Sequence, residues 1–295
     1  MQINFLKYKK IYFIILALIC TASIASLVSF GVKPGIDFTG GSILEIEYKG
    51  ERPENIVIEE KLAGLDLGQF TVQPAQEKGI IIRTKDITEE VHQQVIENLG
   101  RSEIEEKRFE SVGSVIGKEL KEKTITLVLV SLLAIILYIA FAFKKVQGPV
   151  NSWQYALSSL LCLFHDILIP LGVFALLGHL YKVEISIAVI TALLTVIGCS
   201  INNVIVVFDR IRENTMRASG STTFSEIVNG SINQTLGRCL STSFAYLLPL
   251  VAIFLFGGET LKYFSLALIL GIAAGTISGI FLAGPILANW VKVRK

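Results

Sequence analysis

Six apolar segments, each close to the length of a bilayer crossing, constrain the fold of this chain more than any other feature. A helix needs roughly 20 mostly apolar residues to cross the hydrocarbon core. Backbone polar groups in lipid must pair internally, so a chain of this kind crosses as helices. The sequence therefore predicts a multi-pass α-helical membrane protein with six transmembrane helices. The segments cover residues 11–30, 124–143, 155–177, 185–208, 240–256 and 263–291.

The charged residues concentrate in the block between the first two apolar segments. Only 18% of the chain is charged, against about 25% in typical soluble domains. Residues 31–122 contain 12 Lys and Arg against 19 Asp and Glu, whereas the remainder contains 15 against 6. This segregation indicates one acidic soluble domain and a membrane part with basic edges. It gives no reason to expect a nucleic-acid partner.

Basic residues flank the apolar segments mainly at alternate ends, and such residues favour the cytoplasmic side of a membrane. With six crossings these flanks fall on one side, so we expect both termini in the cytoplasm. A cleaved signal peptide is the alternative for the first segment, but its apolar run is longer than a signal core. The flanking residues are Lys7, Lys9, Lys10, Lys144, Lys145, Arg210, Arg212, Arg217, Lys292, Arg294 and Lys295.

This topology divides the chain into four parts. A cytoplasmic N-terminus with the first helix (1–30) precedes an extracytoplasmic domain (31–123). A five-helix transmembrane bundle (124–291), with a cytoplasmic loop at 209–236, precedes a short cytoplasmic tail (292–295).

The soluble block alternates strand-like and helix-like segments. Residues 42–48 alternate as a strand does, with Ile43, Leu44, Ile46 and Tyr48 mostly on one face. The order β-α-β-β-α-β predicts a small ferredoxin-like α+β domain between the first two membrane helices. Thr88 is a candidate helix N-cap. The segments are 42–48, 53–62, 70–72, 80–83, 88–99 and 106–112.

Asp166 is the clearest ionisable residue inside an apolar segment. At 1.5 Å per residue it lies near the middle of its helix, where a carboxylate must be protonated, paired or facing water. Pro170, four residues later, has no N–H to donate to the Asp166 carbonyl, so a cation or water site is one interpretation. The other is a neutral Asp166, bonded to His165 or to a neighbouring helix, that holds two helices together.

Two amides lie near the end of the fourth apolar segment. Asn202 and Asn203 precede a charged helix end, and Ser200 shares a helix face with Asn203 at a spacing of three. Neutral amides relay hydrogen bonds or bind ions, but they do not exchange protons at physiological pH. The alternative role is a bond between helices, worth about 0.6–2 kcal/mol in membranes.

A charge cluster follows these amides, and an arginine opens the next apolar segment. We interpret the cluster as a solvated helix end that anchors the topology, with partner docking as the second interpretation. Arg238 either extends to the membrane interface or joins a polar network, if helix packing brings it toward Asn203. The cluster consists of Asp209, Arg210, Arg212 and Glu213.

Glycines mark two places of close approach or sharp turning. In the last apolar segment they recur at every fourth residue, beside Ser278, and this spacing favours close packing of another helix. After Asp37, the pair Gly40 and Gly41 predicts a turn into the first strand. The packing glycines are Gly271, Gly275 and Gly279.

The cytoplasmic loop carries one helix-start signal. Thr223 and Glu226 have the spacing of a capping box. They predict a helix that begins near Phe224, although residues this common also match the pattern by chance.

The chain lacks a recognisable catalytic constellation. We find no nucleophile–base set, phosphate-binding loop or metal-ligand spacing, so we expect neither an enzyme nor a bound cofactor or metal. The cysteines lie in or beside apolar segments, where a thiol acts as a small apolar side chain. They are Cys20, Cys162, Cys199 and Cys239.

Five motifs, in this order, give the chain a specific resemblance over essentially its full length. It resembles the SecF family, the smaller membrane subunits of the SecD–SecF complex of bacterial protein export. The resemblance implies one half of a fold of the resistance–nodulation–division (RND) type, completed by a six-helix SecD, in the cytoplasmic membrane. The motifs are Gly35–Gly41, His165-Asp166, Ser200–Asn214, Asn233–Thr235 with Arg238, and Leu255–Thr260.

The resemblance also implies a role in export. Such a subunit acts with SecD, and YajC is a further implied partner. A proton or sodium gradient helps it to draw polypeptide outward after the SecYEG channel and the SecA motor have begun the transfer. Two other functions stay open: half of an RND-like exporter of small molecules or lipids, for which about 90 soluble residues are few, and a structural scaffold for the channel.

One position departs from the family pattern. Members typically carry Asp where this chain has Asn203, and that Asp is held to transfer a proton together with the arginine matched here by Arg238. An amide cannot take up and release the proton. Either a partner carboxylate or Asp166 takes over, or the ion is not a proton, or the coupling is weakened. We favour the partner carboxylate.

Overall fold

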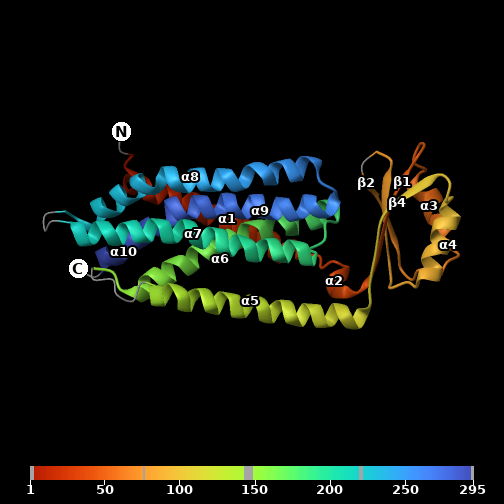
Figure 1. The fold of residues 1–295 in the computed structure, drawn as a ribbon, viewed down its shortest axis with the longest axis horizontal. Coiled ribbons are helices and arrows are strands. Elements are labelled where there is room, and N and C mark those ends of the chain that lie inside the picture. The colour runs from red at the N-terminus through yellow and green to blue at the C-terminus, as the bar shows by residue number, and fades with distance from the viewer. Residues whose placement is uncertain (1–2, 76, 143–148, 219–221, 294–295) are drawn as a thin grey trace. The chain divides into compact units, whose positions relative to one another are not determined.

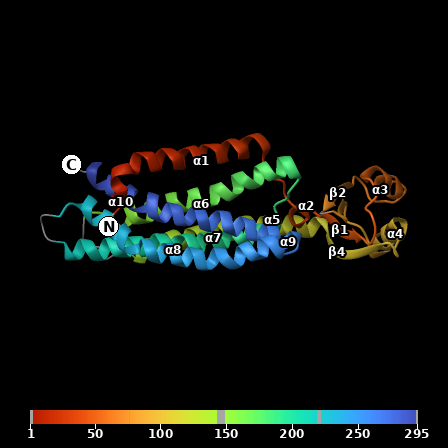
Figure 2. The ribbon, with the colours of Figure 1, turned by 90° about the horizontal axis from the view of Figure 1, so that it is seen from above.

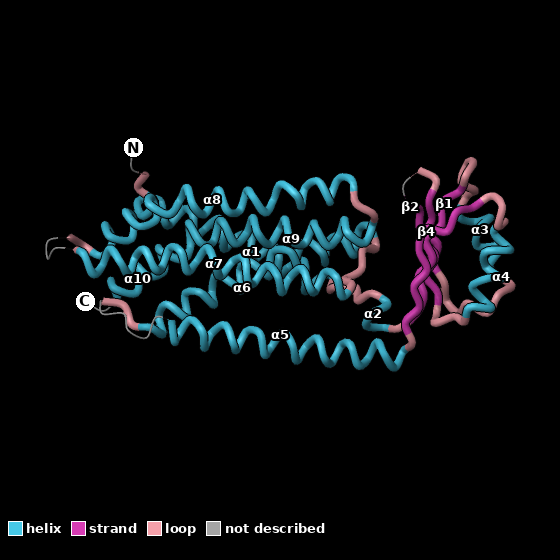
Figure 3. Tube along the Cα trace, viewed as in Figure 1, coloured by secondary structure: helices cyan, strands magenta, loops and turns pink. Residues whose placement is uncertain are grey.

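The computed structural model divides into two compact units, one of residues 1–33 with 128–295 and one of residues 34–127 (Figure 1). The first unit is built of helices, and the second contains the strands (Figure 3). The structure describes residues 3–75, 77–142, 149–218 and 222–293. Four basic residues used to predict the topology lie outside this part of the chain, namely Lys144, Lys145, Arg294 and Lys295.

Six helices of the described chain are long and apolar enough to cross a membrane, which confirms the predicted number. Most of them extend past the apolar segments, because flanking Lys, Glu and Arg are themselves good helix formers. Five of them are α1 (Lys9–Phe30, after the short 3₁₀ helix η1, Phe5–Tyr8), α5 (Ser114–Ala142), α6 (Ser152–Tyr181), α7 (Ile187–Arg217) and α8 (Phe224–Phe256).

The sixth crossing is interrupted within one membrane length. It runs from α9 (Glu259–Ser278) through a π-helical stretch, η2 (Gly279–Ala283), into α10 (Gly284–Val293). Such π-helical stretches are rare and often occur at functional sites. Apolar periodicity alone did not reveal this irregularity, because the residues stay apolar throughout.

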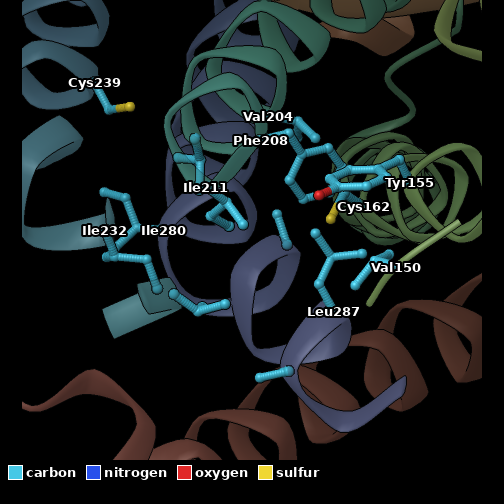
Figure 4. Packing of buried hydrophobic residues seen from close by; sticks show 14 of the residues in the cluster. Val150, Tyr155, Cys162, Val204, Phe208, Ile211, Ile232, Cys239, Ile280 and Leu287 are labelled. Atoms are coloured by element: carbon cyan, nitrogen blue, oxygen red, sulfur yellow. The ribbon is translucent and has the colours of Figure 1, made fainter. Parts of the chain in front are cut away.

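The core of the helical unit lies between α6, α7, α8 and the last crossing, whereas α1 packs along α6 (Figure 2). In this core the ring of Tyr155 on α6 meets Phe208 on α7 edge to face, with centroids 5.2 Å apart (Figure 4). Ile280 and Leu287 fill the same cluster from the last crossing. These contacts use the apolar face of α7, which leaves its polar residues for the neighbouring faces.

The last crossing approaches α7 closely at the three predicted packing glycines. A Cβ on Gly271 would lie 2.2 Å from Val196 Cγ2, and one on Gly275 would lie 2.9 Å from Ser200 Cβ. A Cβ on Gly279 would lie 3.2 Å from the Cβ of Asn203. A Cβ at Gly271 or Gly275 therefore requires a shift of its neighbour, whereas at Gly279 a displacement of Asn203 by a few tenths of an ångström is enough. The approach occurs beside the polar residues of α7.

The soluble unit is a four-stranded antiparallel sheet with two helices, in the predicted order β-α-β-β-α-β. The strand order β2-β3-β1-β4 is that of a ferredoxin-like domain, and the predicted fold is confirmed. Its elements are β1 (Gly41–Tyr48), α3 (Asn55–Leu62), β2 (Thr71–Ala75), β3 (Gly79–Thr84), α4 (Glu89–Leu99) and β4 (Ile104–Val112).

Alternation along β1 decides which residues enter the core of this unit. Leu44, Ile46 and Tyr48 are buried, whereas Ile43 is half-buried with the alternate residues on the other face. Three of the four apolar residues thus share one face, as predicted, and Ile43 is the exception because successive side chains of a strand point to opposite sides.

A short helix precedes β1 where the sequence predicts only a turn. Asp37 lies in α2 (Ile36–Thr39), and the chain then turns at Gly40 and Gly41, with φ of 74° and 129°. A Cβ on Gly41 would lie 2.8 Å from the carbonyl oxygen of Thr84. Both glycines are thus required by their backbone conformation.

Two predicted helix starts have different outcomes. Thr223 and Glu226 form the capping box, with the Thr223 N–H donating to Glu226 Oε2 at 2.8 Å, and α8 begins at Phe224. Thr88 is the N-cap residue of α4, but its side chain makes no capping bond.

Gly275→Ala is expected to lower the thermal stability of the protein in detergent, because the added Cβ would press against Ser200. Overpacking of this kind costs about 1–3 kcal/mol. The matched control is Gly198→Ala on α7, where a Cβ meets nothing within 4 Å. If both variants unfold at the same temperature as the wild type, α7 and the last crossing are not held at this separation.

Candidate functional site

The polar residues of α7 contact two different neighbours. Ser200 meets the carboxylate of Asp166 on α6, whereas Asn203 meets Ser243 on α8. From the sequence, Arg238 either extends to the membrane interface or joins a polar network with Asn203. In the structure the polar residues form a buried carboxylate cluster and an amide–arginine pocket.

The buried carboxylate cluster is centred on Asp166, whose side chain is 0% exposed. Its Oδ1 lies 2.8 Å from Nδ1 of His165, the next residue of α6. Its Oδ2 accepts hydrogen bonds from two hydroxyls, Ser278 at 2.8 Å and Ser200. Asp166 therefore connects three helices, α6, α7 and α9, where the second sequence interpretation has it join two.

The backbone explains why these groups meet. Close packing at Gly275 brings the last crossing against Ser200, and Ser278 follows three residues later on the same helix. Pro170 lies inside α6 and has no N–H, so the Asp166 carbonyl lacks its usual helical donor. The role of Ser278 was missed, because a lone serine among small residues signals packing rather than a carboxylate partner.

Asn203 belongs to a second chain of hydrogen bonds. Its Nδ2 donates to Ser243 Oγ at 3.3 Å, and Thr276 Oγ1 donates to the same oxygen at 2.6 Å. Asn203 is 5% exposed, and Ser243 and Thr276 are also buried. The amide is thereby tied to α8 and α9, and neither hydroxyl partner adds a group that titrates near neutral pH.

A pocket of about 180 Å³ opens beside this amide between α7 and α8. Asn202 and Arg238 are exposed there, and helix packing does bring Arg238 toward Asn203. Within the described chain the guanidinium of Arg238 has no ion-pair partner. The pocket is lined by Asn202, Asn203, Val206, Arg238, Cys239 and Thr242.

The charge cluster at the end of α7 does more than form a solvated helix end. Arg210 pairs with Glu213 at 2.5 Å and donates to Gln234 Oε1 on α8 at 2.5 Å. Asn214 donates to the same oxygen at 2.9 Å and to Ser231 Oγ at 2.8 Å. Arg212 pairs with Asp209 at 3.0 Å within α7. The cluster thus fastens the end of α7 to the start of α8.

Two asparagines on α8 hold the N-terminal segment, and sequence reasoning missed this contact. Asn233 accepts from the backbone N–H of Ile3 at 2.9 Å, and Asn229 accepts from that of Phe5 at 2.8 Å. Their spacing of four residues, on one helix face, was the available signal. In the described residues, no group of three or more His, Cys, Asp or Glu is arranged to hold a metal ion.

Two family models match the chain. One, described as "Protein export membrane protein SecD/SecF, C-terminal", matches residues 91–293, and the "SecD/SecF GG Motif" matches residues 25–51. The protein translocase subunit SecF of Thermobaculum terrenum is 38% identical over 98% of this chain and 94% of its own length. SecF of Vibrio alginolyticus is 37% identical over 96% of this chain and 88% of its own length.

Longer relatives match this chain over only part of their own length. The translocase subunit SecDF of Brucella abortus is 33% identical over 98% of the chain, which spans 37% of that protein. The crystal structure of SecDF from Thermus thermophilus, described as a translocon-associated membrane protein, superposes with a TM-score of 0.84 at 32% identity. The match covers 98% of this chain and 39% of that structure.

Ser243→Ala is expected to destabilise the protein, because it removes the shared partner of Asn203 and Thr276. Each such bond within a membrane is worth about 0.6–2 kcal/mol. The midpoint of thermal unfolding in detergent measures the loss. Ser241→Ala, at an exposed position of the same helix, is the control, and equal midpoints for the two variants would contradict the predicted contribution of these bonds.

Proposed function

Because the chain belongs to the SecD/SecF family of protein-export membrane proteins, we propose that it uses an ion gradient, together with SecD, to promote polypeptide export across the bacterial cytoplasmic membrane. The family match identifies a translocase subunit of the SecF type. Coupling to the gradient is the added step, and the pocket between α7 and α8 supports it.

The observation that carries this proposal is the unpaired guanidinium of Arg238. It lies beside two amides on the surface of a helix pair of membrane length, and no described side chain neutralises it. A charge at this position requires a counter-ion, water or the membrane interface. A carboxylate contributed by SecD is the counter-ion that fits. Because Asn203 is uncharged, it neither neutralises Arg238 nor repels such a carboxylate.

The SecDF relatives support this partner. In them this chain corresponds to less than two fifths of a single polypeptide, so the remainder is available to complete the pocket. Protonation of such a carboxylate would remove its attraction for Arg238. Asn203 donates to Ser243 of α8, which also accepts a hydrogen bond from Thr276 of α9, so a change in the pocket reaches three helices.

The wider assembly follows from the same role. We propose that both termini face the cytoplasm, and that the ferredoxin-like unit faces the other side, where exported polypeptide emerges. The translocation partners are then the SecYEG channel, the SecA motor and YajC. The basic flanks of the helices fit this orientation.

Arg238→Gln is expected to slow export at least about tenfold, because removing one partner of a desolvated charge pair costs roughly 2–5 kcal/mol. The measurement is the rate at which a labelled precursor is chased to its exported form in cells that rely on the variant. Arg217→Gln, whose side chain is 71% exposed at the end of α7, is the control. Normal export by an assembled Arg238→Gln complex, with the gradient intact, would rule the pocket out.

Asn203→Asp is expected to preserve or raise proton-coupled export, because it restores a titratable carboxylate beside Arg238. Export is compared in vesicles energised by a proton gradient alone and by a sodium gradient alone. Complete loss of export from a stably assembled variant would show that the amide itself is required. Asn202→Asp, at the exposed neighbour in the same pocket, tests whether the effect is specific to position 203.

A further inference from the structure

The cluster around Asp166 is separate from the Asn203–Arg238 pocket and has its own chemistry. Asp166 is fully buried and His165 is 3% exposed. Both carboxylate oxygens are engaged, Oδ1 by His165 and Oδ2 by the two serines. Among the described residues, His165 is the only ion-pair partner of Asp166.

Charge balance limits how many protons this pair holds. The titratable groups that interact with Asp166 are His165 and Cys162 on α6 and Cys20 on α1. Among the described residues, α7 and α9 contribute only hydroxyls to this cluster, and a thiol has no positive charge that could balance Asp166. An ionised Asp166 beside a neutral His165 is a bare charge in the core, at a cost of several kcal/mol. The two hydroxyls that donate to Oδ2 offset part of this cost, and uptake of one proton by the pair removes it.

The second nitrogen of His165 provides a place for proton exchange. Nε2 is buried and has no hydrogen-bond partner among the described residues. A histidine bonded to a carboxylate through one nitrogen, with the other free, is arranged to pass protons. When a proton is added at Nε2, the proton on Nδ1 moves to Oδ1. The step converts ionised Asp166 and neutral His165 into a neutral acid and the opposite histidine tautomer.

We propose that His165 and Asp166 form a proton relay within this chain's own helix bundle. A proton suits the pair better than a metal cation does. Hard cations such as Ca²⁺ take six or more oxygen ligands, whereas here one carboxylate oxygen already faces an imidazole nitrogen. Whether the relay contributes to export depends on the proposed function. Proton binding by the pair is measured without any export assay.

Protonation would change how α6 is held to its neighbours. Hydrogen bonds to an ionised carboxylate are roughly twice as strong as bonds to a neutral one. The bonds from Ser200 and Ser278 to Oδ2 join α6 to α7 and α9. Proton uptake at Asp166 therefore loosens both connections at once, and α7 also carries Asn203 three residues beyond Ser200.

Infrared difference spectroscopy of the full chain, assembled with its SecD partner, tests the relay as the pH is lowered. A band from a protonated buried carboxyl group is expected, and Asp166→Asn should remove it. Asp209→Asn, at a side chain that is 58% exposed, should leave it unchanged. His165→Gln should slow the appearance of the band after a pH jump by about 100-fold or more, as loss of a proton-transfer group does.

Ser278→Ala is the second variant in case Asp166→Asn does not assemble. It removes one bond to Oδ2, so the carboxyl band should shift in frequency. The relay is overturned by a band that persists in Asp166→Asn, by an unshifted band in Ser278→Ala, or by an unchanged rate in His165→Gln. Suppression of the band by sodium at fixed pH would assign the site to sodium instead. Normal export without this chain would overturn the proposed function alone.

Discussion

Close approach of α7 and the last crossing is the constraint on which the polar interior depends. Glycine at 271, 275 and 279 lets the backbone of one helix pack against the side chains of the other. At that separation Ser200 and Ser278 both reach one oxygen of Asp166, and Thr276 joins the hydrogen bonds of Asn203. Dispersion contacts between the closely packed helices offset part of the cost of burying these polar groups. A larger residue at Gly271 or Gly275 would move the two helices apart and weaken those contacts.

The helical unit thereby keeps two kinds of chemistry on one helix. On the side of α7 that faces α6, Ser200 donates a hydrogen bond to the buried carboxylate of Asp166, which also contacts His165. Toward α8, α7 presents a neutral amide beside an arginine that lacks a counter-ion in the described chain. The hydrogen bonds of the first arrangement lie within the described chain, and we propose that it binds a proton. We propose that a partner subunit completes the second arrangement.

Most of the fold was predictable from the sequence because it follows from length and periodicity. The six crossings, the order of the ferredoxin-like unit and the capping box at Thr223 all depend on local pattern. The π-helical stretch after Ser278 and the short helix at Asp37 were missed, since neither changes the local composition. In the site, Asp166 and Asn203 stand out as polar residues in apolar segments. Their partners Ser278, Ser243 and Thr276 do not, because only three-dimensional packing brings these common residues to them.

The proposed function depends on a carboxylate of SecD that completes the pocket at Arg238. A structure of the chain in complex with SecD would test this. We expect a SecD carboxylate within about 4 Å of the Arg238 guanidinium, the separation of an ion pair, in a pocket still lined by Asn203. An Arg238 side chain directed to lipid head groups or water, with no carboxylate within reach, would contradict it.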